Sequence, residues 1–78
     1  MDDNKIVEMY LNRDENALKE TKSKYEKYCS YIANNILGSR PDTEECVNDA
    51  YLATWNSIPP NEPKSLRAYI GKIVRNIA

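Results

Sequence analysis

The chain has 78 residues, of which 11 are Lys or Arg and 12 are Asp or Glu, so its formal net charge is −1. This length allows one domain with a small core, and the near-zero charge argues against a general nucleic-acid binder, which is usually basic over its whole surface. No apolar run approaches the ~18 residues that span a membrane, and the first residues lack the basic start and apolar run of a secretory signal, so we expect a cytoplasmic protein without a membrane partner.

Two helices are predicted in the first half of the chain. The first is short, about Asn4 to Asn12, with apolar residues along one side. The second runs from about Glu15 to Leu37, where Asp14 can cap its start and Gly38 is placed to end it. Its apolar stripe consists of Leu18, Tyr25, Cys29, Ile32 and Ile36, widened by Tyr28, Ala33 and Leu37. The lysines that alternate with glutamates in this helix favour a solvated face over a binding patch. The tyrosines at positions 25, 28 and 31 cannot all face one way, so at least one is expected to be exposed.

The third predicted helix begins with a capping box, in which Asp42 is the N-cap, Glu45 is the third helical residue and Pro41 lies just outside. The core stripe that follows consists of Val47, Ala50, Tyr51, Thr54 and Ile58, with Cys46 beside it. The opposite face holds Glu45, Asn48, Asp49, Leu52 and Asn56. Leu52 is a large apolar residue in the middle of this polar face. A single exposed Leu needs no explanation, but one flanked by amides and an acid is also typical of a contact surface.

A proline-rich stretch from Ser57 to Lys64 ends the third helix, because proline fixes φ and removes a backbone donor. It is either a plain connector or a stiff loop that presents side chains. The fourth helix starts with Ser65 as its N-cap. Its polar positions are Arg67, Lys72, Arg75 and Asn76. The helical pattern is still running at Ala78, so we expect this chain to be a fragment whose missing part lies C-terminal.

These elements predict an all-α fold, a compact bundle of about four helices. Charge is segregated within it, because residues 42–56 carry four acids and no base, whereas residues 63–78 carry four bases and no acid. Such segregation indicates either two partners of opposite charge or one partner and one merely solvated face.

The stretch Asp42-Thr-Glu-Glu-Cys-Val-Asn-Asp-Ala-Tyr-Leu-Ala-Thr-Trp55 resembles the core-binding helix of small bacterial sigma factors, the extracytoplasmic-function class of the sigma-70 family. The resemblance continues through Ser65-Leu-Arg-Ala-Tyr-Ile-Gly-Lys-Ile-Val-Arg-Asn76, which is similar to the family's promoter-melting helix, and covers about Tyr25 to Ala78. It implies that residues 1–78 form a region 2 domain, and that the family's second promoter-binding domain is absent from this fragment.

In that family the third helix docks on the clamp helices of the RNA polymerase β′ subunit, so the resemblance assigns core binding to Glu45, Asn48, Asp49, Leu52 and Asn56. The fourth helix and the preceding loop hold the promoter minus-ten element and help flip a base out. This assigns DNA contacts to Asn61, Lys64, Arg67, Lys72, Arg75 and Asn76. An anti-sigma factor is a further partner that the resemblance allows. Tyr69 departs from the family, which mostly has Trp at this position.

Two other classes of function are alternatives. A helical protein–protein adaptor would have the same elements, with the basic helix as a solvated face. An enzyme is not supported, because the chain has no His, no Gly-rich phosphate loop and no nucleophile beside a base. Cys29 and Cys46 lie among apolar neighbours and are predicted to be buried hydrophobic residues. Without His or a closely spaced Cys pair, neither a metal nor a cofactor is expected.

Overall fold

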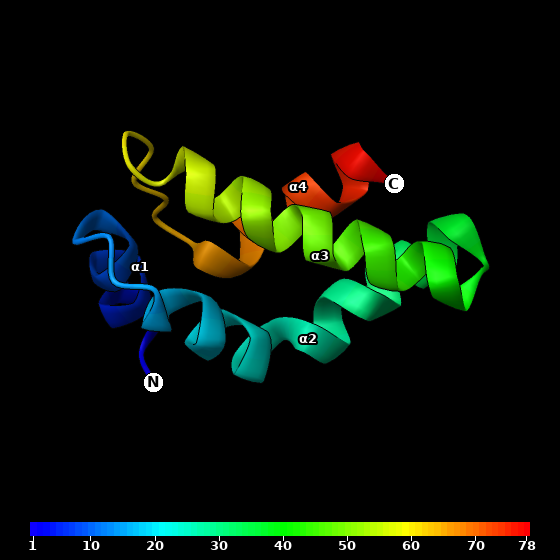
Figure 1. Cartoon of the computed structure of the whole chain (residues 1–78), viewed down its shortest axis with the longest axis horizontal. Coiled ribbons are helices and arrows are strands. Elements are labelled where there is room, and N and C mark those ends of the chain that lie inside the picture. Colours follow the sequence, from blue (N-terminus) through cyan, green and yellow to red (C-terminus); the bar gives the residue numbers. More distant parts are fainter.

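The computed structural model describes residues 1–78 as four α-helices (Figure 1). They are α1 (Asp3–Leu11), α2 (Asn16–Leu37), α3 (Arg40–Ser57) and α4 (Leu66–Ile77). The chain turns back after α2, so that α2 and α3 run side by side in opposite directions, and α4 packs against both of them (Figure 1). At the other end of the bundle, α1 contacts α2 and α4. The predicted all-α bundle is confirmed, and no helix in it has the length and apolar character that crossing a membrane requires.

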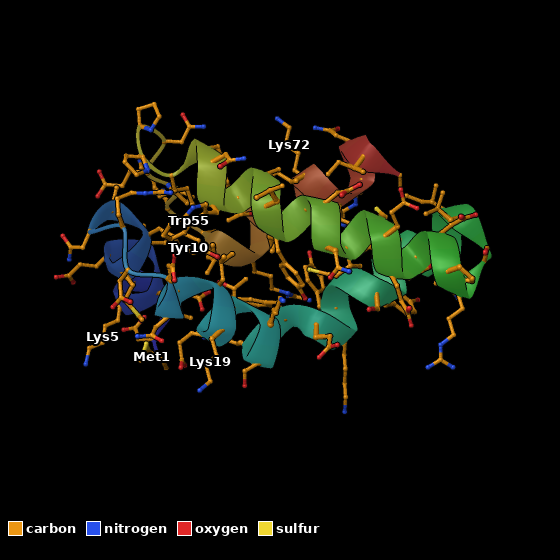
Figure 2. All side chains as sticks on the ribbon, viewed as in Figure 1. Met1, Lys5, Tyr10, Lys19, Trp55 and Lys72 are labelled. Carbon is orange, nitrogen blue, oxygen red and sulfur yellow. The ribbon has the colours of Figure 1, made fainter.

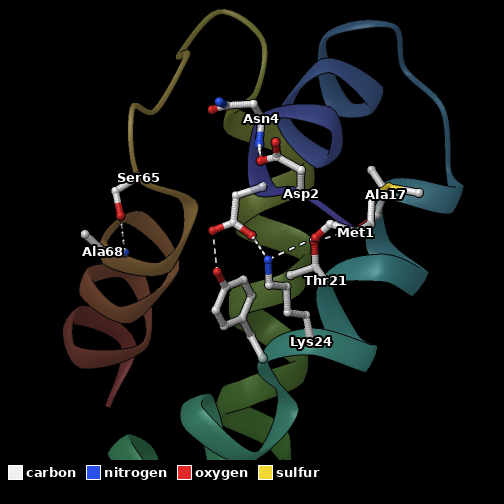
Figure 3. Close-up of polar contacts among 10 residues, drawn as sticks. Met1, Asp2, Asn4, Ala17, Thr21, Lys24, Ser65 and Ala68 are labelled. Carbon is white, nitrogen blue, oxygen red and sulfur yellow. Dashed lines mark hydrogen bonds and ion pairs between the residues drawn. The ribbon is translucent and has the colours of Figure 1, made fainter.

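Most of the predicted helix ends are confirmed within a residue. Asp2, the N-cap residue of α1, accepts a hydrogen bond at 3.0 Å from the backbone N–H two residues later. The N-cap residue of α2 is Glu15, without a side-chain cap, and Asp14 just before it accepts a hydrogen bond at 3.0 Å from the N–H of Asn16. Ser65 accepts one at 3.2 Å from the N–H three residues later, at the start of α4; Figure 3 shows the Asp2 and Ser65 caps. Gly38 ends α2 with φ of 66°, a conformation that glycine adopts without a steric penalty.

The predicted start of α3 is wrong. The helix begins at Arg40 with Ser39 as the N-cap residue, so Asp42 and Glu45 do not form a capping box and Pro41 lies inside the first turn. Proline fits there because the first-turn N–H groups have no partner within the helix, and a missing donor costs nothing. Asp42 still lies in the first turn, where a carboxylate complements the helix dipole.

The core lies between α2, α3 and α4, and α1 closes one end of it. All of the stripe predicted for the third helix is buried, together with Cys46. From α1, Ile6 and Tyr10 are completely buried, and the Tyr10 hydroxyl hydrogen-bonds to Thr21 of α2 at 2.6 Å. Tyr31 is 69% exposed, as expected for at least one of the three tyrosines of α2. Ile36 was expected in the core but is 51% exposed, because it lies in the last turn of α2 at the end of the bundle.

A polar cluster also ties α1 to α2. The Asp3 carboxylate accepts hydrogen bonds from Lys24 and from the Tyr25 hydroxyl, and Lys24 reaches the backbone oxygen of Met1 as well (Figure 3). Partial burial alone would raise the pKa of Asp3, but the hydrogen bonds from Lys24 and Tyr25 outweigh it and bring that pKa below its usual value. Burial and the neighbouring Asp3 charge raise the pKa of Tyr25 to about 12.

Candidate functional site

The acidic face of α3 is open to solvent over its whole length. Its members, which we call the α3 face, are Glu45, Asn48, Asp49, Leu52 and Asn56. They share one side because residues three and four apart on a helix are neighbours, and the buried residues of α3 occupy the other side. Leu52 is central to this set and is 58% exposed. The five residues assigned to core binding therefore form one continuous surface.

A shallow hollow of about 250 Å³ extends the α3 face toward the end of α4. Its lining consists of Leu37, Asp42, Glu45, Cys46, Asp49 and Ile77. Three of these side chains are carboxylates and none is basic, and Ile77 is 41% exposed. The α3 face therefore continues into a surface that is both acidic and apolar.

The basic residues of α4 are also exposed, and the structure places them on two sides of the helix. The chain contains two ion pairs, Lys24 with Asp3 and Arg40 with Glu44, so no base of α4 has a carboxylate partner. Lys72 projects away from the bundle (Figure 2), and Asn76 follows it one helical turn later. The free charges on α4 are available to a negatively charged partner.

Arg67 and Arg75 lie on the side of α4 that faces α2. The Arg67 guanidinium sits over the Tyr28 ring, 4.4 Å from its centroid. Gly71 lies between the two arginines, one turn from each, and allows a close approach of the helices. A Cβ at this position would lie 2.6 Å from the Tyr28 hydroxyl oxygen and 3.3 Å from Nη1 of Arg75. The residues assigned to DNA binding on α4 thus divide into an Arg67–Arg75 row and a Lys72–Asn76 row.

The loop between α3 and α4 is tied down by a chain of hydrogen bonds. The Asn61 amide donates to the Tyr69 hydroxyl at 2.9 Å, and that hydroxyl shares a hydrogen bond of 2.6 Å with Ser57 at the end of α3. Ser57 in turn reaches the Thr54 carbonyl at 3.4 Å. Asn61 and Lys64 are exposed on this loop. The Tyr69 hydroxyl therefore sets the position of Asn61.

Sequence reasoning missed the part played by Arg13, which lies between the first two predicted helices. Its guanidinium lies 3.6 Å from the centroid of the Trp55 ring and donates to the carbonyl oxygens of Trp55 and Ile58, each at 2.7 Å. Trp55 in turn lies beside Tyr10 (Figure 2), with ring centroids 6.1 Å apart. Arg13 thus satisfies carbonyl groups that the end of α3 leaves free, next to the loop that carries Asn61.

Both cysteines are free and buried, as predicted. Burial, with a smaller contribution from Cys46, raises the pKa of the Cys29 thiol to about 11, so it is protonated at neutral pH. Burial also raises the pKa of Cys46. Because the thiolate is the reactive form, these cysteines act as packing residues in this fold.

Comparison with known families gives one match, to the family described as Sigma-70 region 2, over residues 23–78. Neither the comparison with curated proteins nor that with solved structures gives a significant match. The matched segment contains most of α2, all of α3 and α4, the α3 face and the exposed bases of α4. With more than two thirds of its residues in that match, the chain belongs to the sigma-70 family through its region 2, a domain of transcription initiation factors.

Proposed function

We propose that residues 1–78 form a domain that joins RNA polymerase core to the promoter, with α3 docking on the clamp of the β′ subunit and α4 holding the minus-ten element. The observation that carries the proposal is the pairing of two exposed surfaces on adjacent helices, an acidic one built around Leu52 and a basic one without carboxylate partners. Each suits a partner of opposite charge. Both partners are found in the cytoplasm, where we place the protein.

The α3 face has the composition of a small binding hot spot. A large apolar side chain at the centre contributes by losing contact with water, and the surrounding acids and amides set the orientation of the partner. An arginine-rich helical partner would complement Glu45 and Asp49, while the exposed Leu52 side chain supplies the apolar contact.

The test of core binding is Leu52→Ala. We expect it to weaken binding of polymerase core, or of a β′ clamp fragment, by roughly 1–3 kcal/mol, a typical loss for a central interface residue. The matched control is Ile36→Ala, which removes an apolar side chain of similar exposure from α2, outside the α3 face. Retention of the clamp fragment by Leu52→Ala at the level of the control would contradict the assignment.

On α4 and the preceding loop, different residues position the DNA strand and read its bases. Lys72 and Arg75 are charged and do not distinguish between DNA sequences, so they neutralise phosphates and make DNA binding salt-dependent. Asn76 on α4 and Asn61 on the loop have amide groups, which can discriminate between base edges. The hydrogen bond from Asn61 to Tyr69 supports this division, because it orders an amide at the edge of the loop before DNA arrives.

The adaptor alternative makes a different prediction from the same variants. It is favoured if Leu52→Ala lowers core binding while substitutions of Lys72 and Arg75 leave promoter binding by the assembled polymerase unchanged. The basic side of α4 would then be a solvated surface.

A further inference from the structure

A cluster on the α2 side of α4 combines two guanidinium groups with a tyrosine hydroxyl. Arg67 stacks on the Tyr28 ring, while the Tyr28 hydroxyl and Nη1 of Arg75 both border the space above Gly71, where a Cβ would lie. The cluster joins two helices, since Tyr28 belongs to α2 and the other residues to α4. The sequence pattern placed Tyr28 only in the apolar stripe of its helix.

All three polar groups of this cluster lack the partners that such groups usually have. Neither arginine is in an ion pair, although the chain carries 12 acids. The tyrosine hydroxyls that hydrogen-bond within the chain are those of Tyr10, Tyr25 and Tyr69, so the Tyr28 hydroxyl is free to donate. Arg67 and Arg75 are exposed and Tyr28 is half-buried, so a ligand can reach them.

We propose that Tyr28, Arg67 and Arg75 together bind one phosphodiester group of the promoter DNA strand. A phosphate has several acceptor oxygens and can accept from two guanidinium groups and a hydroxyl at once. The ring of Tyr28 holds the Arg67 guanidinium in place, which reduces the side-chain entropy lost on binding. Gly71 is the residue that makes the site, because any side chain there would displace the Tyr28 hydroxyl.

This inference rests on the proposed function, in that it takes α4 to face DNA, and it adds α2 to the DNA-binding surface. It also changes how the phosphate contacts are grouped. Arg67 and Arg75 share one phosphate, whereas Lys72, in the other row of α4, binds a different one. The distinction is measurable, because the salt dependence of binding follows the number of phosphates neutralised.

The experiment uses polymerase core assembled with the chain and a promoter DNA whose minus-ten region is single-stranded. Binding is measured over a series of salt concentrations for Arg67→Gln, Arg75→Gln, Lys72→Gln, the Arg67/Arg75 double variant and the Arg67/Lys72/Arg75 triple variant. The Arg67/Arg75 double variant is expected to lower the slope of log affinity against log salt by about 0.7, the value for one phosphate of a single strand. Adding Lys72→Gln to that double variant is expected to lower the slope by about the same amount again, since a second phosphate contact is then lost.

Tyr28→Phe separates a binding role from a packing role. It keeps the ring under Arg67 and removes only the hydroxyl, so the bundle should unfold at the same urea concentration or a higher one. DNA affinity should fall roughly two- to tenfold, the effect of losing one hydrogen bond, while the salt slope stays the same. A Tyr28→Phe protein with unchanged DNA affinity would overturn the proposal, as would an Arg67/Arg75 double variant that loses the slope of two phosphates. If no variant of Arg67, Lys72 or Arg75 changes the slope, α4 does not face DNA and the proposed function itself fails.

Discussion

Arg13 makes the contact whose energetic value can be worked out most directly from the structure. Its guanidinium stacks on Trp55, which contributes about 0.5–1 kcal/mol at an exposed site. The two hydrogen bonds to carbonyl oxygens add about 1 kcal/mol each in net terms. Against this, the Arg13 backbone has φ of 56°, a left-handed conformation that costs a non-glycine residue about 1–2 kcal/mol. The side chain therefore more than offsets the strain that its position imposes.

Replacing Arg13 by two different residues separates these contributions. Arg13→Ala removes the side-chain contacts and keeps the strain, so the free energy of unfolding should fall by about 2–3 kcal/mol. Arg13→Gly removes both, so it should be more stable than Arg13→Ala by about 1 kcal/mol. For a chain of this size each 1 kcal/mol corresponds to roughly 4–8 °C in the melting temperature.

The measurement is urea and thermal unfolding followed by circular dichroism, with Lys19→Ala as the control for loss of an exposed cation from α2. The control should stay within about 0.5 kcal/mol of the wild-type protein. Two results would refute this account of Arg13: an Arg13→Ala protein as stable as the control, or an Arg13→Gly protein less stable than Arg13→Ala.

Three further predictions concern other parts of the chain. Gly71→Ala gains about 1 kcal/mol in helix propensity but places a methyl group against the Tyr28 hydroxyl. Urea unfolding should therefore show a net loss of stability, and this loss should be smaller in a Tyr28→Phe protein, which lacks the hydroxyl. An equal loss in both backgrounds would exclude the steric cause. The pKa of Asp3 is below its usual 3.8 in the folded protein, so its stabilising effect is complete above that pH and is lost as the pH falls through the lower folded value. The free energy of unfolding of Asp3→Asn should therefore fall less than that of the wild-type protein as the pH is lowered. An equal fall for the two proteins would contradict this role of Asp3. In open-complex assays with single-base promoter variants, Asn76→Ala should change which base is preferred at one position. An equal decrease in open-complex formation on all promoters would show that Asn76 contacts only phosphate.

The elements and the two charged surfaces could be predicted because they depend on local pattern. The α3 face follows from the helical period alone, and the capping role of Ser65 follows from the side chain available at that helix start. The start of α3 could not be predicted in the same way. Asp42 and Glu45 have the spacing of a capping box, but residues just before them, including Pro41, also fit a first turn, so two local signals competed.

The contacts that shape the candidate site depend instead on residues distant in sequence. Arg13 and Trp55 are 42 residues apart, and nothing in the pattern around either predicts the other. From the sequence alone, Gly71 is a residue of low helix propensity inside a helix. The structure shows that the Tyr28 hydroxyl lies against it. Similarly, the role of Asn61 depends on Tyr69 reaching back to the end of α3. Such pairings are decided by how the helices pack, which the sequence of one element does not determine.

The position of α1 has a consequence for how this family's boundaries are drawn. The segment that matches the family, residues 23–78, excludes Ile6, Val7 and Tyr10, yet these side chains fill one end of the core. A chain that began at residue 23 would leave that end of the core open to water. It would also lose the hydrogen bonds that Arg13 donates to the end of α3. The residues that close the core therefore extend beyond the segment that matches the family.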